Sequence, residues 1–169
     1  MASKSMELHK KLSTKDIQCG IITLSDSKAK NPKEDISGDY IANQIKSKYF
    51  LKSKMIIPDE KDILLKTIEA MINKKIDVIL TTGGTGLEHR DITIETVNEI
   101  FDKKINGFGE IFRLKSYEEL GSGALLSRAT AGLYKQTIIF SMPGSPDAVE
   151  TGMKIIIDEL PHLVSHAKK

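Results

Sequence analysis

Cysteine, tryptophan and long apolar runs are scarce or absent in this chain of 169 residues. The single cysteine, Cys19, excludes a disulfide within the chain; it lies in an apolar run and is expected to be a small buried side chain in a reducing compartment. The absence of tryptophan argues against an aromatic platform for stacked nucleic-acid bases. No run approaches the roughly 18 apolar residues of a membrane span, and residues 1–16 lack the apolar core of a secretion signal. We therefore expect a soluble, cytoplasmic protein.

Neither sign of charge dominates. Charged residues make up 28% of the chain and leave a net charge of +2. Proteins that bind nucleic acid carry clustered basic faces, whereas the lysines here are scattered. The composition gives no support to a nucleic-acid or membrane partner, and the length favours one domain with a core of its own.

Strand-like apolar runs alternate with helical patterns. Residues 1–16 are expected to form a flexible arm and residues 17–169 one domain. Strands are predicted at 19–24, 54–58 and 77–82, and a strand pair over 127–144 with a turn near 134–136. Helices are predicted at 39–49, near 64–72, from about 93 to 101, within 104–123, and from Ser145 to a stop before Pro161. This order predicts an α/β fold, a three-layer α/β/α sandwich with a mostly parallel sheet.

In such sheets, ligands bind beyond the carboxyl ends of the strands. Four loops are predicted to converge there: "SDS" at 25–27, "PDE" at 58–60, "GGTG" at 83–86 and "MPGSPD" at 142–147. Glycines at the third loop leave backbone N–H groups free to face an anion, and Thr85 adds a hydroxyl donor. Gly144, before a helix start, favours the same chemistry. The alternative is that these glycines only let the chain turn.

Two aspartates, Asp59 and Asp91, follow predicted strands on the same rim. A carboxylate repels bound phosphate unless a cation lies between them, and Mg²⁺ takes one or two carboxylates together with phosphate oxygens. The pair therefore predicts a Mg²⁺ site that serves phosphoryl or nucleotidyl transfer. The alternative is that each aspartate only caps a helix.

Other catalytic signatures are missing. The sequence has no GxxxxGK[ST] or GxGxxG phosphate loop, no GxSxG nucleophile, and no HExxH or CxxC metal spacing. Arg113 and Arg128 are candidates for pairing with phosphate, and Glu110 for a polar ligand contact, although structural roles explain each equally well. Three aromatic side chains are expected either at a subunit contact or in the core: Phe101, Phe108 and Phe112.

Four segments in this order carry a family resemblance: "TLSDS…DISGDYI", "IIPDE", "TTGGTGLEHRD" and "SMPGSPDAVE". Together they resemble the molybdenum-cofactor biosynthesis proteins of the MogA/MoaB family, over roughly residues 18–163. The stretch "GFGEIFRLKSYEELGSGALLSRATAG" is more similar to the MoaB branch.

The resemblance implies a molybdopterin-binding α/β/α domain that forms a homotrimer or a dimer of trimers, a homohexamer. Active members of the family are molybdopterin adenylyltransferases, which use Mg²⁺ and ATP to join AMP to the terminal phosphate of molybdopterin and release pyrophosphate. Their product passes to a MoeA-like enzyme that inserts molybdate or tungstate.

By the same resemblance, Asp59 and Asp91 match the family's catalytic, metal-holding aspartates. The expected nucleotide and pterin-phosphate pocket consists of Ser25, Asp26, Gly83, Gly84, Thr85, Gly86, Pro143, Gly144 and Ser145. The presence of Asp59 favours an active enzyme. The alternatives are a non-catalytic molybdopterin carrier of the MoaB branch, another enzyme built on the same domain, and an interaction module.

Overall fold

The computed structural model describes residues 16–30 and 35–169, so the predicted arm lies almost wholly outside the described residues. Within them, one sheet has the strand order β2-β1-β3-β6-β5-β4. The strands are β1 Gln18–Leu24, β2 Phe50–Ile57, β3 Val78–Thr82, β4 Lys103–Lys104, β5 Thr130–Tyr134 and β6 Thr137–Met142. The first four in this order run parallel, whereas β5 pairs antiparallel with both of its neighbours, β6 and β4. The expected mostly parallel sheet is confirmed.

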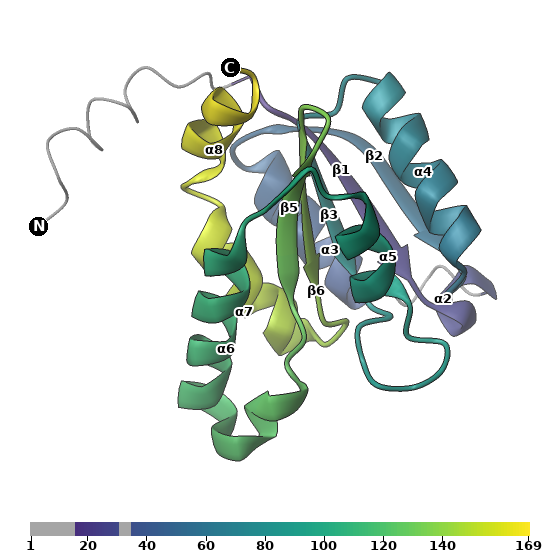
Figure 1. The fold of residues 1–169 in the computed structure, drawn as a ribbon, viewed down its shortest axis with the longest axis vertical. Coiled ribbons are helices and arrows are strands. Elements are labelled where there is room, and N and C mark those ends of the chain that lie inside the picture. Colours follow the sequence, from purple (N-terminus) through teal and green to yellow (C-terminus); the bar gives the residue numbers. More distant parts are fainter. Residues whose placement is uncertain (1–15, 31–34) are drawn as a thin grey trace, which may run out of the picture.

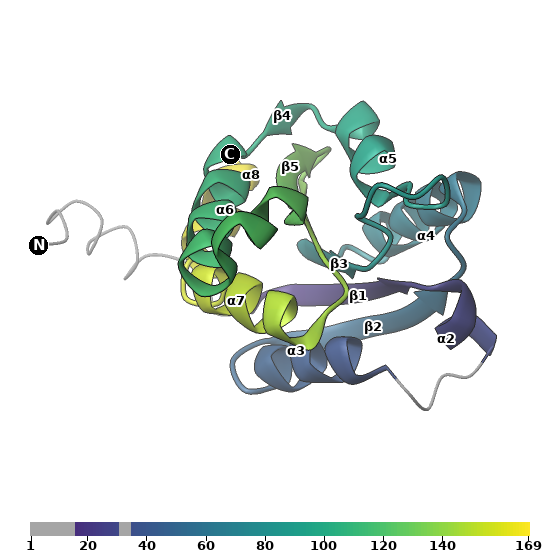
Figure 2. The ribbon, with the colours of Figure 1, turned by 90° about the horizontal axis from the view of Figure 1, so that it is seen from below.

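Helices cover both faces of the sheet (Figures 1 and 2). They are α2 Asp26–Lys30, α3 Ile36–Lys46, α4 Lys61–Asn73, α5 Thr93–Ile100, α6 Asn106–Leu120, α7 Pro146–Ile156 and α8 Leu160–Ala167, with a 3-10 turn, η2, at Gly121–Leu126. One core lies between the sheet and α3, α6, α7 and α8, and a second lies between the sheet and α4 and α5. The predicted three-layer sandwich is therefore confirmed. None of these helices is long and apolar enough to cross a membrane.

The central strands are apolar because both of their faces are buried. In β1, Cys19 and Ile21 enter one core, while Ile22 and Leu24 enter the other. All five residues of β3 are buried. Continuous apolar runs of this kind are typical of parallel strands covered on both sides, and they bring the polar strand ends to one rim.

Two boundaries differ from the sequence prediction. Helix α3 begins at Ile36 rather than 39, because Asp35 caps it: Oδ1 accepts a hydrogen bond from Gly38 N at 3.1 Å. Strand β2 begins at Phe50 rather than 54. Its early residues are half exposed because β2 is an edge strand, where lysines are common, so its first half lacks the apolar pattern of a buried strand.

The end of the chain also differs. Val149, Met153 and Ile156 are buried, but α7 ends at Ile156. A second helix, α8, then begins at Leu160, so Pro161 lies in its first turn instead of following a helix. Proline is favoured in a first turn because its missing N–H costs no hydrogen bond there.

The β5–β6 hairpin and the three phenylalanines were also predicted from the sequence. The β5–β6 hairpin turns at Lys135, with φ of +57°, as predicted near 134–136. Phe108 and Phe112 are buried, and the Phe108 ring meets the Phe140 ring edge-on with centroids 5.0 Å apart. Phe101 packs against the second core. Phe108 and Phe112 therefore lie in the core, whereas Phe101 is only partly buried, and a subunit contact by Phe101 stays a prediction.

Candidate functional site

The four predicted loops do meet at the carboxyl ends of the parallel strands. Ser25 N donates to Ile57 O at 2.9 Å, which joins the loops after β1 and β2. Gly83 N donates to Met142 O at 3.2 Å, which joins the loops after β3 and β6. A Cβ on Gly144 would lie only 3.2 Å from the Gly83 Cα, so the glycine loops pack backbone against backbone.

The GGTG loop requires glycine for its own conformation. Gly83 and Gly84 have φ of +92° and +61°, and a Cβ on Gly83 would lie 2.2 Å from Leu24 O. Thr93 holds the loop: its Oγ1 donates to Gly83 O and its N to Gly84 O, both at 2.9 Å. Thr85 is buried. The turning role of the glycines is thus established, and anion binding by the loop stays a prediction.

A carboxylate pair spans the first two loops. Asp26 N donates to Asp59 Oδ2 at 3.1 Å, and Asp59 N donates to Asp26 Oδ1 at 3.2 Å. Arg90 reaches Asp26 with two nitrogens, Nη2 to Oδ1 at 2.9 Å and Nε to Oδ2 at 2.6 Å. The hydrogen bond from Arg90 lowers the pKa of Asp26, whereas burial raises the pKa of Asp59. The pKa values of the neighbouring carboxyl groups of Asp26 and Asp59 are therefore shifted in opposite directions.

The two predicted catalytic aspartates each lie against one glycine of the loop. A Cβ on Gly84 would lie 2.6 Å from Asp59 Oδ1, and one on Gly86 would lie 2.5 Å from Asp91 Oδ2. Asp91 Oδ2 accepts a hydrogen bond from Glu88 N at 2.9 Å within its own turn. Neither α4 nor α5 has a side-chain cap hydrogen bond, so neither aspartate caps the helix that follows it.

One atom of this cluster fits a cation. Asp59 Oδ1 is buried and has no hydrogen-bond partner in the described part of the chain. Leaving a buried carboxylate oxygen unpaired is costly unless a ligand completes it. Among the described residues, no group of three or more His, Cys, Asp and Glu side chains is arranged to hold a metal. Mg²⁺ in nucleotide sites needs fewer protein ligands, because phosphate oxygens supply the rest.

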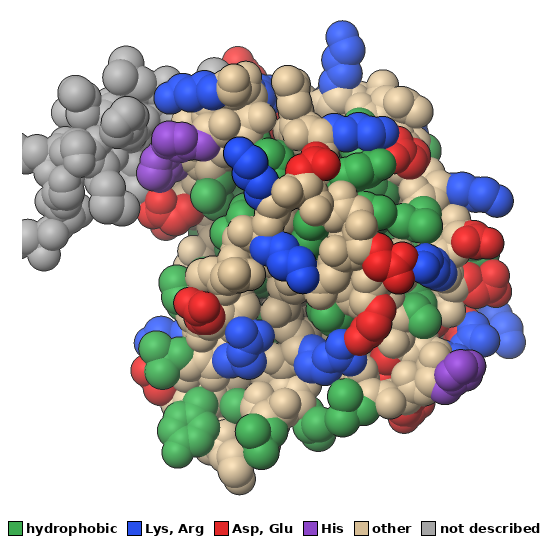
Figure 3. All heavy atoms as spheres, viewed as in Figure 1, with side chains coloured by type: hydrophobic (Ala, Val, Ile, Leu, Met, Phe, Trp, Pro, Cys, Tyr) green, Lys and Arg blue, Asp and Glu red, His purple; other side chains and the backbone are tan. Residues whose placement is uncertain are grey.

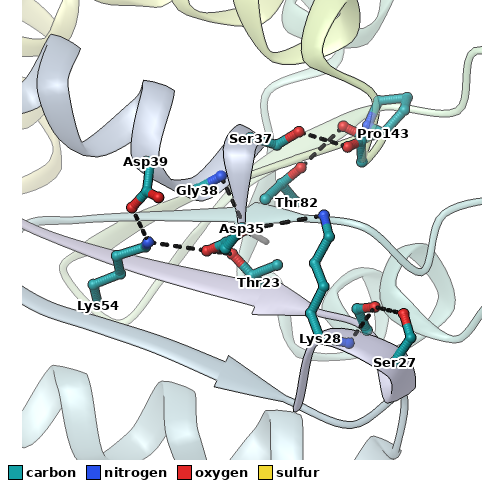
Figure 4. Close-up of polar contacts among 12 residues, drawn as sticks. Thr23, Ser27, Lys28, Asp35, Ser37, Gly38, Asp39, Lys54, Thr82 and Pro143 are labelled. Carbon is teal, nitrogen blue, oxygen red and sulfur yellow. Dashed lines mark hydrogen bonds and ion pairs between the residues drawn. The ribbon is translucent and has the colours of Figure 1, made fainter. Parts of the chain in front are cut away.

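The last loop, at Pro143–Gly144–Ser145, is fixed by hydroxyl groups (Figure 4). Thr82 Oγ1 donates to Pro143 O at 3.0 Å, and Ser37 Oγ donates to Gly144 O at 2.7 Å. Ser145 caps α7 as predicted, and its Oγ accepts from Ala148 N at 3.3 Å. Pro143 and Ser145 also line a cavity of about 440 Å³ that extends toward α6 and η2. The loop is thus held by two hydroxyl groups and borders this cavity.

The remaining polar candidates lie beside the rim. Arg128 Nη1 donates to Gly86 O at 2.7 Å, and its Nη2 pairs with Glu95. Arg128 therefore supports the glycine loop. Arg113 and Glu110 line a separate cavity of about 320 Å³ next to α6.

The sequence reading missed Arg90, Asp35 and Ser37. Arg90 directly precedes Asp91 in "EHRD", and this position next to a predicted site residue could have marked it as a candidate. Asp35 and Ser37 lie in "DISG", a pattern typical of a helix cap. Their partners are distant in the chain, so only the fold shows what they hold.

Residues 20–162 match a family model described as "Probable molybdopterin binding domain". The chain belongs to the MogA/MoaB family of molybdenum-cofactor biosynthesis proteins. It is 44% identical to the molybdopterin adenylyltransferase of Pyrococcus furiosus, over 97% of this chain and 99% of that protein. It is 40% identical to molybdenum cofactor biosynthesis protein B of Bacillus subtilis, over 98% of each.

The fold agrees with this family. The crystal structure of the tungsten cofactor synthesizing protein MoaB from P. furiosus is similar with a TM-score of 0.88 and 42% identity, covering 93% of this chain and all of that one. The family membership predicted from the four segments is therefore confirmed. The roles of the individual site residues stay predictions.

Proposed function

We propose that this protein is a molybdopterin adenylyltransferase, which transfers AMP from ATP to the terminal phosphate of molybdopterin. The observation that carries the proposal is Asp59 Oδ1, a buried and unpartnered acceptor beside a glycine loop. A cation next to a phosphate-binding backbone is what nucleotidyl transfer requires. The near full-length similarity to a protein named for this activity supports the same conclusion.

In the proposed reaction, a terminal phosphate oxygen of molybdopterin forms a bond to the α-phosphorus of ATP. The bond from this phosphorus to the bridging oxygen breaks, and its electron pair leaves with pyrophosphate. A phosphate monoester is largely deprotonated near pH 7, so the attack needs no strong general base. The protein's contribution is to position two polyanions and balance their charge.

Asp59 and Asp91 would hold Mg²⁺, which when bound neutralises charge that develops on the phosphates. Arg90 keeps Asp26 ionised and fixed in place, and the backbone exchange between Asp26 and Asp59 orients the second carboxylate. Because burial raises the pKa of Asp59, a proton and a cation compete for this carboxylate more closely than at an exposed aspartate.

The decisive assay is pyrophosphate release from MgATP with purified molybdopterin, compared between wild type, Asp59→Ala and Asp91→Ala. A matched control is Asp62→Ala, an exposed carboxylate in the first turn of α4. We expect turnover in wild type and control, and a loss of at least about a hundredfold in each site variant.

Wild type that binds molybdopterin but releases no pyrophosphate would overturn the enzymatic proposal and favour a molybdopterin carrier. Equal losses in Asp62→Ala and the site variants would remove the special role of the two aspartates. Folding of each variant is checked by thermal unfolding before its activity is interpreted.

The proposal includes assembly of identical subunits, as trimers or paired trimers. Apolar side chains are exposed on α6 and η2: Ile111, Leu114, Tyr117, Leu120, Leu125 and Leu126. Figure 3 shows hydrophobic side chains gathered at the lower end of the molecule, where α6 meets η2. Contiguous exposed apolar surface of this kind marks an interaction site. Light scattering compares the mass of wild type with that of Leu125→Asp, which should shift toward monomer.

The proposal also includes a partner: the adenylylated product would pass to a MoeA-like enzyme that inserts the metal.

A further inference from the structure

Lys28 follows the end of β1 and reaches from α2 toward the start of α3 (Figure 4). Its side chain is 27% exposed, and its Nζ lies 4.0 Å from Asp35 Oδ1, at the outer limit of an ion pair. Other cations around the rim are held more closely, Arg90 Nε at 2.6 Å from Asp26 and Lys54 Nζ at 3.0 Å from Asp35. Among the described residues, Lys28 is therefore a cation beside the rim with one weak partner.

Asp35 is already satisfied without Lys28. Its side chain is wholly buried; Oδ1 accepts from Gly38 N at 3.1 Å, and Oδ2 accepts from Thr23 Oγ1 at 3.0 Å. Lys54 supplies the compensating charge. If Lys28 moved toward a ligand, no buried acceptor would lose its hydrogen bond, so the movement would carry a small internal cost.

The position of the Lys28 ammonium is set by elements of the site. Asp35 caps α3, and two residues later Ser37 Oγ donates to Gly144 O in the last rim loop. Thr23, which also binds Asp35, lies near the carboxyl end of β1. The ammonium thus lies where β1, α3 and the Gly144 loop meet.

The rim's charge calls for such a group. Asp59 and Asp91 lie against the glycine loop, and Asp26 lies beside Asp59. Arg90 is already paired with Asp26. The proposed substrates bring phosphates to this acidic surface. A lysine ammonium binds phosphate as a mobile point charge with three donors.

We propose that Lys28 binds a phosphate group of a substrate, either the triphosphate of ATP or the terminal phosphate of molybdopterin, and that its weak pairing with buried Asp35 keeps the ammonium near the rim while leaving it free to move to the phosphate. This inference rests on the proposed function, because it takes the phosphorylated substrates of that reaction.

The test compares Lys28→Met, Lys28→Arg and the control Lys30→Met, which removes an exposed lysine from the same short helix. Calorimetry measures the binding of two probes separately, MgATP alone and molybdopterin alone. We expect Lys28→Met to weaken one probe about tenfold, the effect of one charge-assisted hydrogen bond. Lys28→Arg should restore most of the loss, and Lys30→Met should bind both probes within about twofold of wild type. The probe that weakens identifies which phosphate Lys28 meets.

Unchanged binding of both probes by Lys28→Met, or an equal loss in Lys30→Met, would overturn the inference. Failure of the proposed function is a separate result: wild type would bind both probes and release no pyrophosphate, while the Lys28 effect on binding would persist. Turnover in wild type with the same Kd and kcat/KM in Lys28→Met would remove the role of Lys28 alone. Unfolding temperatures within about 2 °C of wild type show that the variants are folded.

Discussion

Replacing Gly84 by alanine tests the link between the bare loop and the acid beside it. Gly84 has φ of +61°, where an L-residue is strained by about 1–2 kcal/mol. The new Cβ would lie 2.6 Å from both Asp59 Oδ1 and Thr93 Oγ1, so these side chains must move. Moving Thr93 breaks its hydrogen bond to Gly83 O, worth about 1 kcal/mol. We expect a total loss of about 2–3 kcal/mol in the free energy of unfolding.

Urea unfolding followed by circular dichroism measures this loss, and the unfolding temperature should fall by roughly 5–10 °C. The control is Gly107→Ala, because a Cβ there meets nothing within 4 Å and its φ is not positive. That control should be neutral or gain up to about 1 kcal/mol. Gly84→Ala within about 0.5 kcal/mol of wild type would refute the reasoning, since neither the strain nor the contact would then exist. The variant should also lose MgATP binding more than the control does.

Three further predictions follow from the titrating groups. Asp59→Asn should be more stable than wild type at pH 7 and equal to it near pH 3. Burial raises the native pKa of Asp59, so wild type loses stability as pH rises from the unfolded pKa through the native pKa, and Asn does not; melting curves across pH decide this. Arg90→Ala should raise the pKa of Asp26 in a carbon-13 NMR titration and lower stability at pH 7 but not below the native pKa, and an unmoved titration would contradict the pairing. Burial raises the pKa of the Cys19 thiol to about 12, so a thiol-reactive dye should label it only after unfolding, and rapid labelling of the native protein would show that β1 opens.

Local chemistry made much of the fold predictable. The runs at Cys19–Leu24 and Val78–Thr82 are apolar throughout, and Ser145 before a proline marks a helix start. These signals reside in adjacent residues, so a pattern can find them. The predicted limits of strands and helices were wrong where contacts distant in the chain determine them. The first half of β2 contains polar residues, which an edge strand tolerates, so its start was not recognised. Pro161 lies in the first turn of α8, a helix that the adjacent residues did not predict.

The candidate site divides in the same way. The glycine loop and the acids Asp59 and Asp91 were readable because strand ends in a parallel sheet share one rim. The contacts that hold the site together could not be predicted from the sequence. Arg90 pairs with Asp26 across 64 positions of the chain, and Ser37 bonds to Gly144 across 107. No spacing rule predicts such pairs, because folding places them through contacts of other residues.

The sequence by itself determined the layers of this protein, the edge of the sheet at which its chemistry lies, and the family to which it belongs. It did so through apolar periodicity and four short segments, which are properties of neighbouring residues. Only the tertiary structure decided which carboxylate is paired, which is left with a buried unsatisfied oxygen, and which lysine stands beside them. Those outcomes depend on burial and distance, and both arise only when segments far apart in the chain pack together.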